Sequence, residues 1–208
     1  MLGLTLARPN GVPPRVLAIG AHADDIEIGC GATILRLVAE NPGLSMDWLV
    51  LSGHGERASE ATDSAAAFLR GAGATNVMVE GFRDGFFPYL GEAVKERFEQ
   101  LKSEVAPDLV LTHRLVAELT WNTFRDHLIL EYEIPKYEGD LGHPNLYVRL
   151  TQEQGEHKVE LLRKCFPSQV GRSWFSDDIF WATLRLRGIE CNAPGRYAEA
   201  FQARKLVL

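Results

Sequence analysis

The chain has 208 residues, of which 46% are hydrophobic and 24% charged, and its formal net charge at pH 7 is −6. This composition is typical of a globular protein, and the acidic balance argues against a nucleic-acid partner, which needs clustered, uncompensated Lys and Arg. Because no apolar run reaches the ~18 residues of a membrane span and the first residues lack a signal-peptide pattern, we expect a cytoplasmic protein.

The first predicted elements form a strand that passes directly into a helix. Residues 1–14, rich in Gly and Pro, are expected to be a loose arm before a buried strand over 15–22. Apolar residues then recur at helical spacing from Ile28 to Ala39, and the Asn-Pro-Gly sequence at 41–43 ends this helix.

The same alternation continues along the first half of the chain. Further strands are expected over 46–53, 75–82 and 108–113, and further helices over 56–73, with a glycine cap at its end, and over 91–106, with Pro107 beyond its end. Strands that alternate with helices predict right-handed βαβ units. We therefore expect an α/β fold with a Rossmann-like, mostly parallel sheet, helices on both faces, and one domain over 1–208.

The second half is less regular. A strand is expected over 145–150, a helix that opens at the Thr151 and Gln154 capping box, and another helix over 178–188. Between them and the regular half lies the long segment 115–139, which begins with a helical pattern. Exposed apolar faces in this half would suit a symmetric homo-oligomer.

The segment after the first strand contains the glycine pair Gly29 and Gly31. A dinucleotide fingerprint would need a third glycine where Ile34 stands, and adjacent carboxylates would repel a pyrophosphate. A nucleotide-binding Rossmann domain is therefore the weakest interpretation. The glycines are expected instead to let the helix pack closely on the sheet.

Three polar side chains, His22, Asp24 and Asp25, follow the first strand within four positions. This is the carboxyl end of the strand, where open α/β sheets place their sites. Imidazole nitrogen and carboxylate oxygen are ligands that zinc accepts. The competing interpretation is a helix-capping aspartate beside a turn histidine. The pattern favours a metal site.

The sequence AHADD at 21–25 resembles the His-Pro-Asp-Asp signature of the LmbE-like, or PIG-L-type, zinc-dependent N-deacetylases, with Ala23 in place of proline. The similarity continues through 55–57 with Glu60, 81–85, 119–142, 187–192 and 197–201. Because these enzymes deacetylate compounds that contain N-acetylglucosamine, the resemblance implies a hydrolase for a small amino-sugar substrate that uses zinc or another divalent metal. It implies that His22 and Asp25 bind the metal and that Asp24 is the general base.

One part of the family pattern is missing. The third metal ligand and a second catalytic histidine come from an H-x-x-H or H-x-D-H segment after the fourth strand, which this chain lacks. His113 and His127 are the two candidates for the third ligand. Position favours His113, because the first and fourth strands of a doubly wound sheet are neighbours. His127 is expected on a helix about four turns farther on, paired with Glu131.

Without a third ligand, the chain would be a catalytically impaired relative that binds a sugar or a partner protein. For the general acid, the candidates are His54, after the second strand, and His113 if it does not bind the metal. Arg57 and Asp84 lie in the loops after the second and third strands, in settings that match the family. They are candidates for substrate binding.

Aromatic residues are frequent in the segment 115–139. Trp121 and Phe124 are expected in the core, because aromatic residues at helical spacing are more often packed than exposed. Tyr137 and Glu138 remain candidates for the lining of a cleft.

Overall fold

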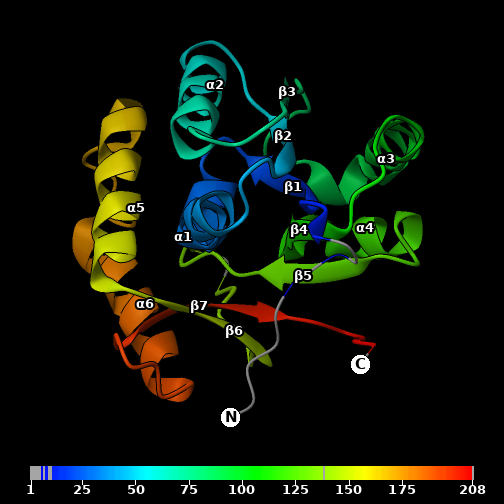
Figure 1. The fold of residues 1–208 in the computed structure, drawn as a ribbon. Helices are drawn as coiled ribbons and strands as arrows, with labels where there is room; N and C mark the ends of the chain where they lie inside the picture. The colour runs from blue at the N-terminus through cyan, green and yellow to red at the C-terminus, as the bar shows by residue number, and fades with distance from the viewer. Residues whose placement is uncertain (1–5, 7, 9–10, 138, 208) are drawn as a thin grey trace.

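A mixed sheet forms the centre of the molecule (Figure 1). The computed structural model describes residues 6, 8, 11–137 and 139–207, so most of the expected arm lies outside the described residues. The strands are β1 (Arg15–His22), β2 (Ser45–Ser52), β3 (Thr75–Val79), β4 (Leu109–His113), β5 (Leu128–Tyr132), β6 (Leu146–Leu150) and β7 (Tyr197–Gln202). Their order is β3-β2-β1-β4-β5-β7-β6. The first five strands are parallel, whereas β7 pairs antiparallel with β5 and β6.

Helices cover both faces of this sheet, which confirms the expected α/β fold. They are α1 (Asp25–Glu40), α2 (Glu56–Phe68), α3 (Gly91–Glu104), α4 (Ala117–Thr123), α5 (Gln152–Cys165) and α6 (Asp177–Glu190), with short 3-10 turns at Phe87–Tyr89, Arg114–Val116 and Pro167–Gln169. In Figure 1, α1, α2 and α5 lie on one side of the sheet and α3 and α4 on the other. Helix α6 packs beside β7. The predicted capping box at Thr151 and Gln154 opens α5.

The core has one layer on each face of the sheet. In β1, Val16 and Ala18 face the layer of α1, α2 and α5, whereas Leu17 and Ile19 face the layer of α3 and α4. All four side chains are buried. A strand that is apolar on both faces is typical of the centre of a parallel sheet, so this sequence keeps β1 between two helical layers.

Close packing of α1 on its neighbours depends on its two glycines, as expected. A Cβ atom at Gly29 would lie 2.1 Å from Cδ2 of Tyr132, and one at Gly31 would lie 2.7 Å from Cε1 of Phe68. The Tyr132 side chain lies beneath the helix, and its hydroxyl donates a hydrogen bond of 2.7 Å to the carbonyl of Ile19. The glycines thus bring the first turns of α1 against β5 and α2.

Helix α1 is kinked at Cys30, where φ is −143° and ψ is 19°. The kink frees backbone groups that two buried side chains satisfy. Nζ of Lys158 donates to the carbonyl oxygen of Ile28 at 2.5 Å, and Glu199 accepts from the backbone N–H of Thr33 at 2.6 Å. Because buried backbone groups need partners, α5 and β7 support the bend that aims the first turn of α1.

The segment after β4 differs from the expectation. Helix α4 ends at Thr123, so His127 lies in the turn before β5 and not on a helix. The predicted pair of His127 with Glu131 is wrong, because the Glu131 carboxylate accepts from Nε1 of Trp121 at 2.7 Å. The expected core positions are confirmed, since Phe124 is fully buried and Trp121 packs half-buried against the same layer.

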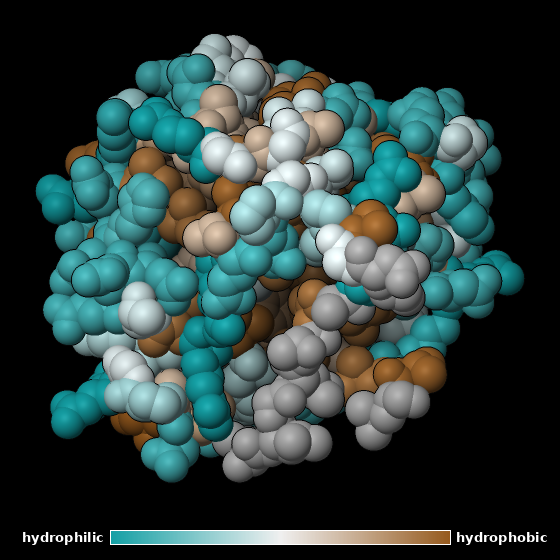
Figure 2. Space-filling model, viewed as in Figure 1, coloured by the Kyte–Doolittle hydropathy of each residue, from teal (hydrophilic) through white to brown (hydrophobic). Residues whose placement is uncertain are grey.

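The surface is mixed. Figure 2 shows hydrophilic residues over most of the rim of this face and hydrophobic residues toward its centre. On α6, Leu186 and Ile189 are exposed apolar residues of the kind that a homo-oligomer would cover, and such an assembly stays a prediction. Within the described part of the chain, no helix combines the length and apolar character that crossing a bilayer requires.

Candidate functional site

The candidate site lies at the carboxyl ends of β1 and β4, which are neighbours as expected. His22 is the last residue of β1, and His113 is the last residue of β4. Asp24 and Asp25 occupy the turn from β1 into α1, and both side chains are buried. The strand order therefore brings residues 91 positions apart in the chain (113 − 22) to the same edge of the sheet.

Both histidines meet at one oxygen of Asp25. Nδ1 of His22 is hydrogen-bonded to Oδ2 of Asp25 at 3.1 Å, whereas Nδ1 of His113 lies 3.0 Å from the same oxygen without the geometry of a hydrogen bond. The backbone N–H of His22 also donates to this oxygen at 2.9 Å. A fully buried carboxylate is thus surrounded by nitrogen atoms.

The other ring nitrogen of each histidine faces a second carboxylate. Nε2 of His22 lies 2.9 Å from Oδ1 of Asp84, and Nε2 of His113 lies 3.3 Å from Oδ2 of Asp140. His113 also stacks on the ring of Tyr132, at 5.8 Å between centroids. A carboxylate at Nε2 favours a proton there, so Nδ1 of a neutral ring is the atom left to bind a metal.

Two cations bind the aspartates. Nζ of Lys136 lies 2.7 Å from Oδ1 of Asp24 and 3.0 Å from Oδ1 of Asp25. Nη2 of Arg57 lies 2.8 Å from the other oxygen of Asp24. Lys136 also lies over the ring of Trp174, 4.5 Å from its centroid. The protein therefore supplies its own positive charges to both buried carboxylates.

Arg57 is held in place from its far side. Its Nη1 lies 2.7 Å from Oε2 of Glu60, a carboxylate that is only 5% exposed. Ser168 completes the set, because its backbone N–H and its hydroxyl donate to the Glu60 carboxylate at 2.8 and 2.7 Å. This network fixes the guanidinium against Asp24.

These contacts perturb the acid-base properties of the site. Burial opposes the charged form of His113, but the charges of Asp25 and Asp140 outweigh it and raise the pKa of His113 to about 9. Burial likewise acts against the charge on Asp25, yet Lys136 and His113 hold its pKa well below the usual range. For His22, the hydrogen bond and the charge of Asp25 overcome burial and raise the pKa. The neighbouring carboxylates therefore favour the protonated form of both histidines in the protein without a metal.

The donor atoms fit a divalent cation in kind. Two imidazole nitrogens and a carboxylate oxygen are the set that catalytic zinc sites use, and the carboxylates at Nε2 leave Nδ1 of His22 and His113 facing Asp25. As it stands, no group of three or more His, Cys, Asp or Glu among residues 6, 8, 11–137 and 139–207 is spaced to hold a metal. The Lys136 ammonium supplies positive charge at the same carboxylates.

Most residues singled out from the sequence lie together at this edge: His22, Asp24, Asp25, Arg57, Asp84 and His113. His54 follows β2 at the same edge, where its ring lies against Gly81. His127 precedes β5, so it lies at the opposite edge from His113, the last residue of the parallel strand β4. Tyr137 is exposed, with its hydroxyl 3.1 Å from Ser173, and Glu138 lies outside the described residues.

The sequence interpretation missed Lys136 and Asp140. Both follow β5, which was not recognised as a strand, so nothing placed them at the carboxyl edge of the sheet. Glu60 was noticed only as part of the family resemblance. A strand assigned to the apolar residues Leu128, Ile129 and Leu130 would have brought the loop after it to the site.

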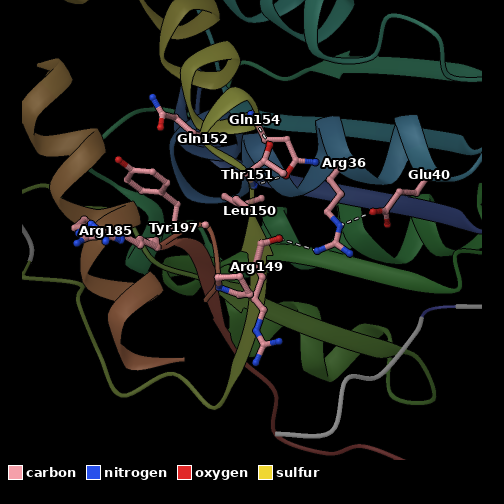
Figure 3. Close-up of a pocket in the computed structure, with 12 residues that line it drawn as sticks. Arg36, Glu40, Arg149, Leu150, Thr151, Gln152, Gln154, Arg185 and Tyr197 are labelled. Atoms are coloured by element: carbon pink, nitrogen blue, oxygen red, sulfur yellow. Dashed lines mark hydrogen bonds and ion pairs between the residues drawn. The ribbon is translucent and has the colours of Figure 1, made fainter. Parts of the chain in front are cut away.

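A hollow of about 910 Å³ lies elsewhere on the molecule (Figure 3). It is lined by Arg36, Glu40, Arg149–Gln152, Gln154, Arg185 and Pro194–Tyr197. Because α1 rises ~1.5 Å per residue, Arg36 lies about 16 Å along the helix from Asp25. In Figure 3, the Arg149 guanidinium points away from Thr151 and Gln154. None of the lining residues belongs to the candidate site, so this hollow is separate from it.

Comparison with known proteins gives a family. The family described as "PIG-L: GlcNAc-PI de-N-acetylase" matches residues 17–134, more than half of the chain. None of the curated proteins matches the chain.

Several solved structures share the fold. The N,N'-diacetylchitobiose deacetylase from Pyrococcus horikoshii has a TM-score of 0.66 and 20% identity, with 91% of this chain and 83% of that chain covered. The 4-carboxy-2-hydroxymuconate hydratase GalB from Pseudomonas putida KT2440 has a TM-score of 0.72 and 16% identity, with 94% of this chain and 98% of that chain covered. The zinc-inhibited form of teicoplanin deacetylase Orf2 has a TM-score of 0.66 and 13% identity, with 91% of this chain and 97% of that chain covered. These likenesses concern the fold, which is shared by deacetylases and a hydratase.

Proposed function

This chain belongs to the PIG-L family of GlcNAc-PI de-N-acetylases, and from that membership we propose that it removes the N-acetyl group from an N-acetylglucosamine-type amino sugar or glycoconjugate with the help of zinc or another divalent metal. The convergence of His22 and His113 on Oδ2 of Asp25 is the observation that carries this proposal. The names of similar structures also support it, since two are deacetylases and one of these is described with zinc as an inhibitor.

In this proposal, His22, Asp25 and His113 hold the metal. When bound, a divalent cation supplies a Lewis acid for the acetamide carbonyl and makes water more acidic. Asp84 and Asp140 hold the two imidazoles by accepting from Nε2, which leaves each Nδ1 as the ring nitrogen for the metal. The chain thus positions the ligands through buried contacts on both sides of each ring.

Asp24 is proposed as the general base. It lies beside Asp25, at the start of α1, and a carboxylate there can accept the proton of an attacking water. One of its oxygens is bound by Lys136 and the other by Arg57, and both cations stabilise the charged form that accepts the proton. His54, at the same edge of the sheet, is proposed to protonate the leaving amine.

Arg57 and Asp84 are proposed to bind the sugar. Asp84 is mostly exposed, with 74% of its side chain accessible, so one carboxylate oxygen can accept from a sugar hydroxyl while the other holds His22. The Arg57 guanidinium has donors directed at Asp24 and Glu60, and it is 26% exposed. Arg57 contacts Asp24 and Asp84 contacts His22, so both groups can orient a substrate beside these residues.

Acetate release from N-acetylglucosamine and its glycoconjugates, measured with and without added zinc, tests this function. We expect metal-dependent release that falls by about 100-fold or more in Asp24→Asn, because general-base catalysis contributes factors of that size. Asp63→Asn changes an exposed aspartate on α2 and should leave the rate unchanged. Absence of acetate from the wild-type chain in saturating zinc would contradict the proposal.

A second candidate function is favoured by the ion pairs of Lys136 and Arg57, which neutralise both aspartates without a metal. In that case the chain is an impaired relative that binds a sugar or a partner protein. Calorimetric titration with the same sugars distinguishes the two: binding without acetate release indicates the second function, and release indicates the first.

A further inference from the structure

Lys136 is not an ordinary surface lysine. Its side chain is only 14% exposed and comes from the loop after β5, where its backbone N–H donates to the carbonyl of Ile134 at 2.9 Å. Its ammonium reaches across to the first turn of α1, between the carboxylates of Asp24 and Asp25. A buried ammonium needs such charged partners, so its position is specific.

The Lys136 ammonium also shares the Asp25 carboxylate with the two histidines of the proposed metal site, so its charge acts on the affinity for a metal there. Nζ lies 3.0 Å from Oδ1 of Asp25, and the two histidine nitrogens face Oδ2 of the same carboxylate. A divalent cation among those nitrogens would share the carboxylate with the ammonium. The ammonium and the cation would then bind the same carboxylate, and two positive charges so placed repel each other strongly where little water screens them.

The ammonium also lies over an aromatic ring while it binds the two carboxylates. Trp174, from the segment before α6, presents its ring 4.5 Å from Nζ of Lys136. A lysine stem has several rotatable bonds, so the ammonium can withdraw from the carboxylates and stay on the aromatic face. This withdrawal would free an oxygen of Asp24 as well as the charge of Asp25.

We propose that Lys136 is a resident counterion that competes with the divalent cation for Asp25, so that it sets the metal affinity of the site. The inference rests on the proposed metal site. Without metal, Lys136 bridges Asp24 and Asp25. With metal, it leaves both carboxylates and keeps only its contact with the Trp174 ring.

Metal affinity measured directly tests this. Zinc titration by calorimetry, and the visible spectrum of bound Co²⁺, report binding without any need for activity. Lys136→Met removes the charge but keeps the length, and we expect it to bind metal about tenfold more tightly or better, since a nearby positive charge is gone. Lys136→Arg keeps the charge and should stay as weak as wild type. Lys164→Met, at an exposed position on α5, is the matched control and should not differ from wild type.

If Lys136→Met folds poorly, thermal unfolding with and without zinc still tests the proposal. Without metal this variant leaves two buried carboxylates short of a partner, so we expect a lower Tm that zinc raises more than it raises the Tm of wild type. A Trp174→Leu variant keeps the lysine but removes the aromatic ring that would hold the ammonium after it leaves the carboxylates, and should weaken metal binding.

The outcomes separate this inference from the proposed function. Equal metal affinity in wild type and Lys136→Met overturns the competition and leaves a metal-dependent enzyme standing. Binding only in Lys136→Met supports the competition and indicates that the wild-type chain is the impaired relative. Binding in neither protein overturns both the competition and the metal site.

Discussion

Lys158 of α5 and Glu199 of β7 form a buried ion pair, 2.7 Å long, against the kink of α1. Each side chain is at most 3% exposed, and each also satisfies backbone groups of α1. The pair therefore joins the irregular second half of the chain to the helix that carries Asp25.

Loss of Glu199 should destabilise the whole domain. Glu199→Ala leaves the Lys158 charge buried without its partner, and we expect the free energy of unfolding to fall by about 3 to 5 kcal/mol. Urea denaturation measures this. Glu160→Ala, at an exposed position on α5, should change it by less than about 0.5 kcal/mol. A small effect of Glu199→Ala would mean that the network contributes little to stability.

Glu27 predicts a pH-dependent stability. Burial raises the pKa of this carboxyl from 4.5 to about 8. Because the folded state holds the proton more tightly, the contribution of Glu27 to stability is highest below pH 4.5 and is lost as pH rises from 4.5 to about 8, by about 5 kcal/mol in all. Glu27→Gln should abolish most of this loss. Chemical denaturation of both proteins at pH 5 and pH 8.5, in a chelator, measures the difference, and parallel pH profiles would refute the assignment.

Close packing at Gly29 can be tested with a matched glycine. Gly29→Ala places a methyl group 2.1 Å from the Tyr132 ring, and overpacking of this kind costs about 1 to 3 kcal/mol or more. At Gly91, the first residue of α3, a Cβ atom would meet nothing within 4 Å, so Gly91→Ala should be neutral or stabilising by about 0.4 to 1 kcal/mol. The two variants are compared by thermal unfolding, where equal Tm values would contradict the expectation.

Asp140 should act on the metal through His113. Asp140→Asn replaces the carboxylate that faces Nε2, and partners of this kind contribute about 10- to 100-fold to metal affinity. Zinc titration measures the loss, with Asp126→Asn, in the exposed turn before β5, as control. Unchanged affinity would indicate that His113 does not bind the metal.

Much of the fold could be predicted because its signals are local. The run from Arg15 to His22 is apolar on both faces, which is typical of a central parallel strand, and β1 has those bounds. The capping box at Thr151 likewise opens α5 where the sequence places it. Propensity and periodicity sufficed for these elements.

Strands β5 and β7 were not predicted, because their conformation depends on distant partners. Leu128–Tyr132 reads as part of a longer helical or irregular segment until β4 pairs with it, and Tyr197–Gln202 becomes a strand between β5 and β6. Lys136 follows the first of these strands. The aspartates and histidines were found from their spacing, whereas their counterion could be found only from the sheet order.

The site is divided along the chain. His22, Asp25 and His113 precede residue 134, where the family match ends, whereas Lys136 and Trp174 follow it. Substitutions in the later segment can therefore change the charge and the aromatic surface around the aspartates without altering the signature itself. Divergent descendants of one ancestor could keep identical ligands and still differ in which cation they retain, so inheritance of the signature alone does not fix the chemistry.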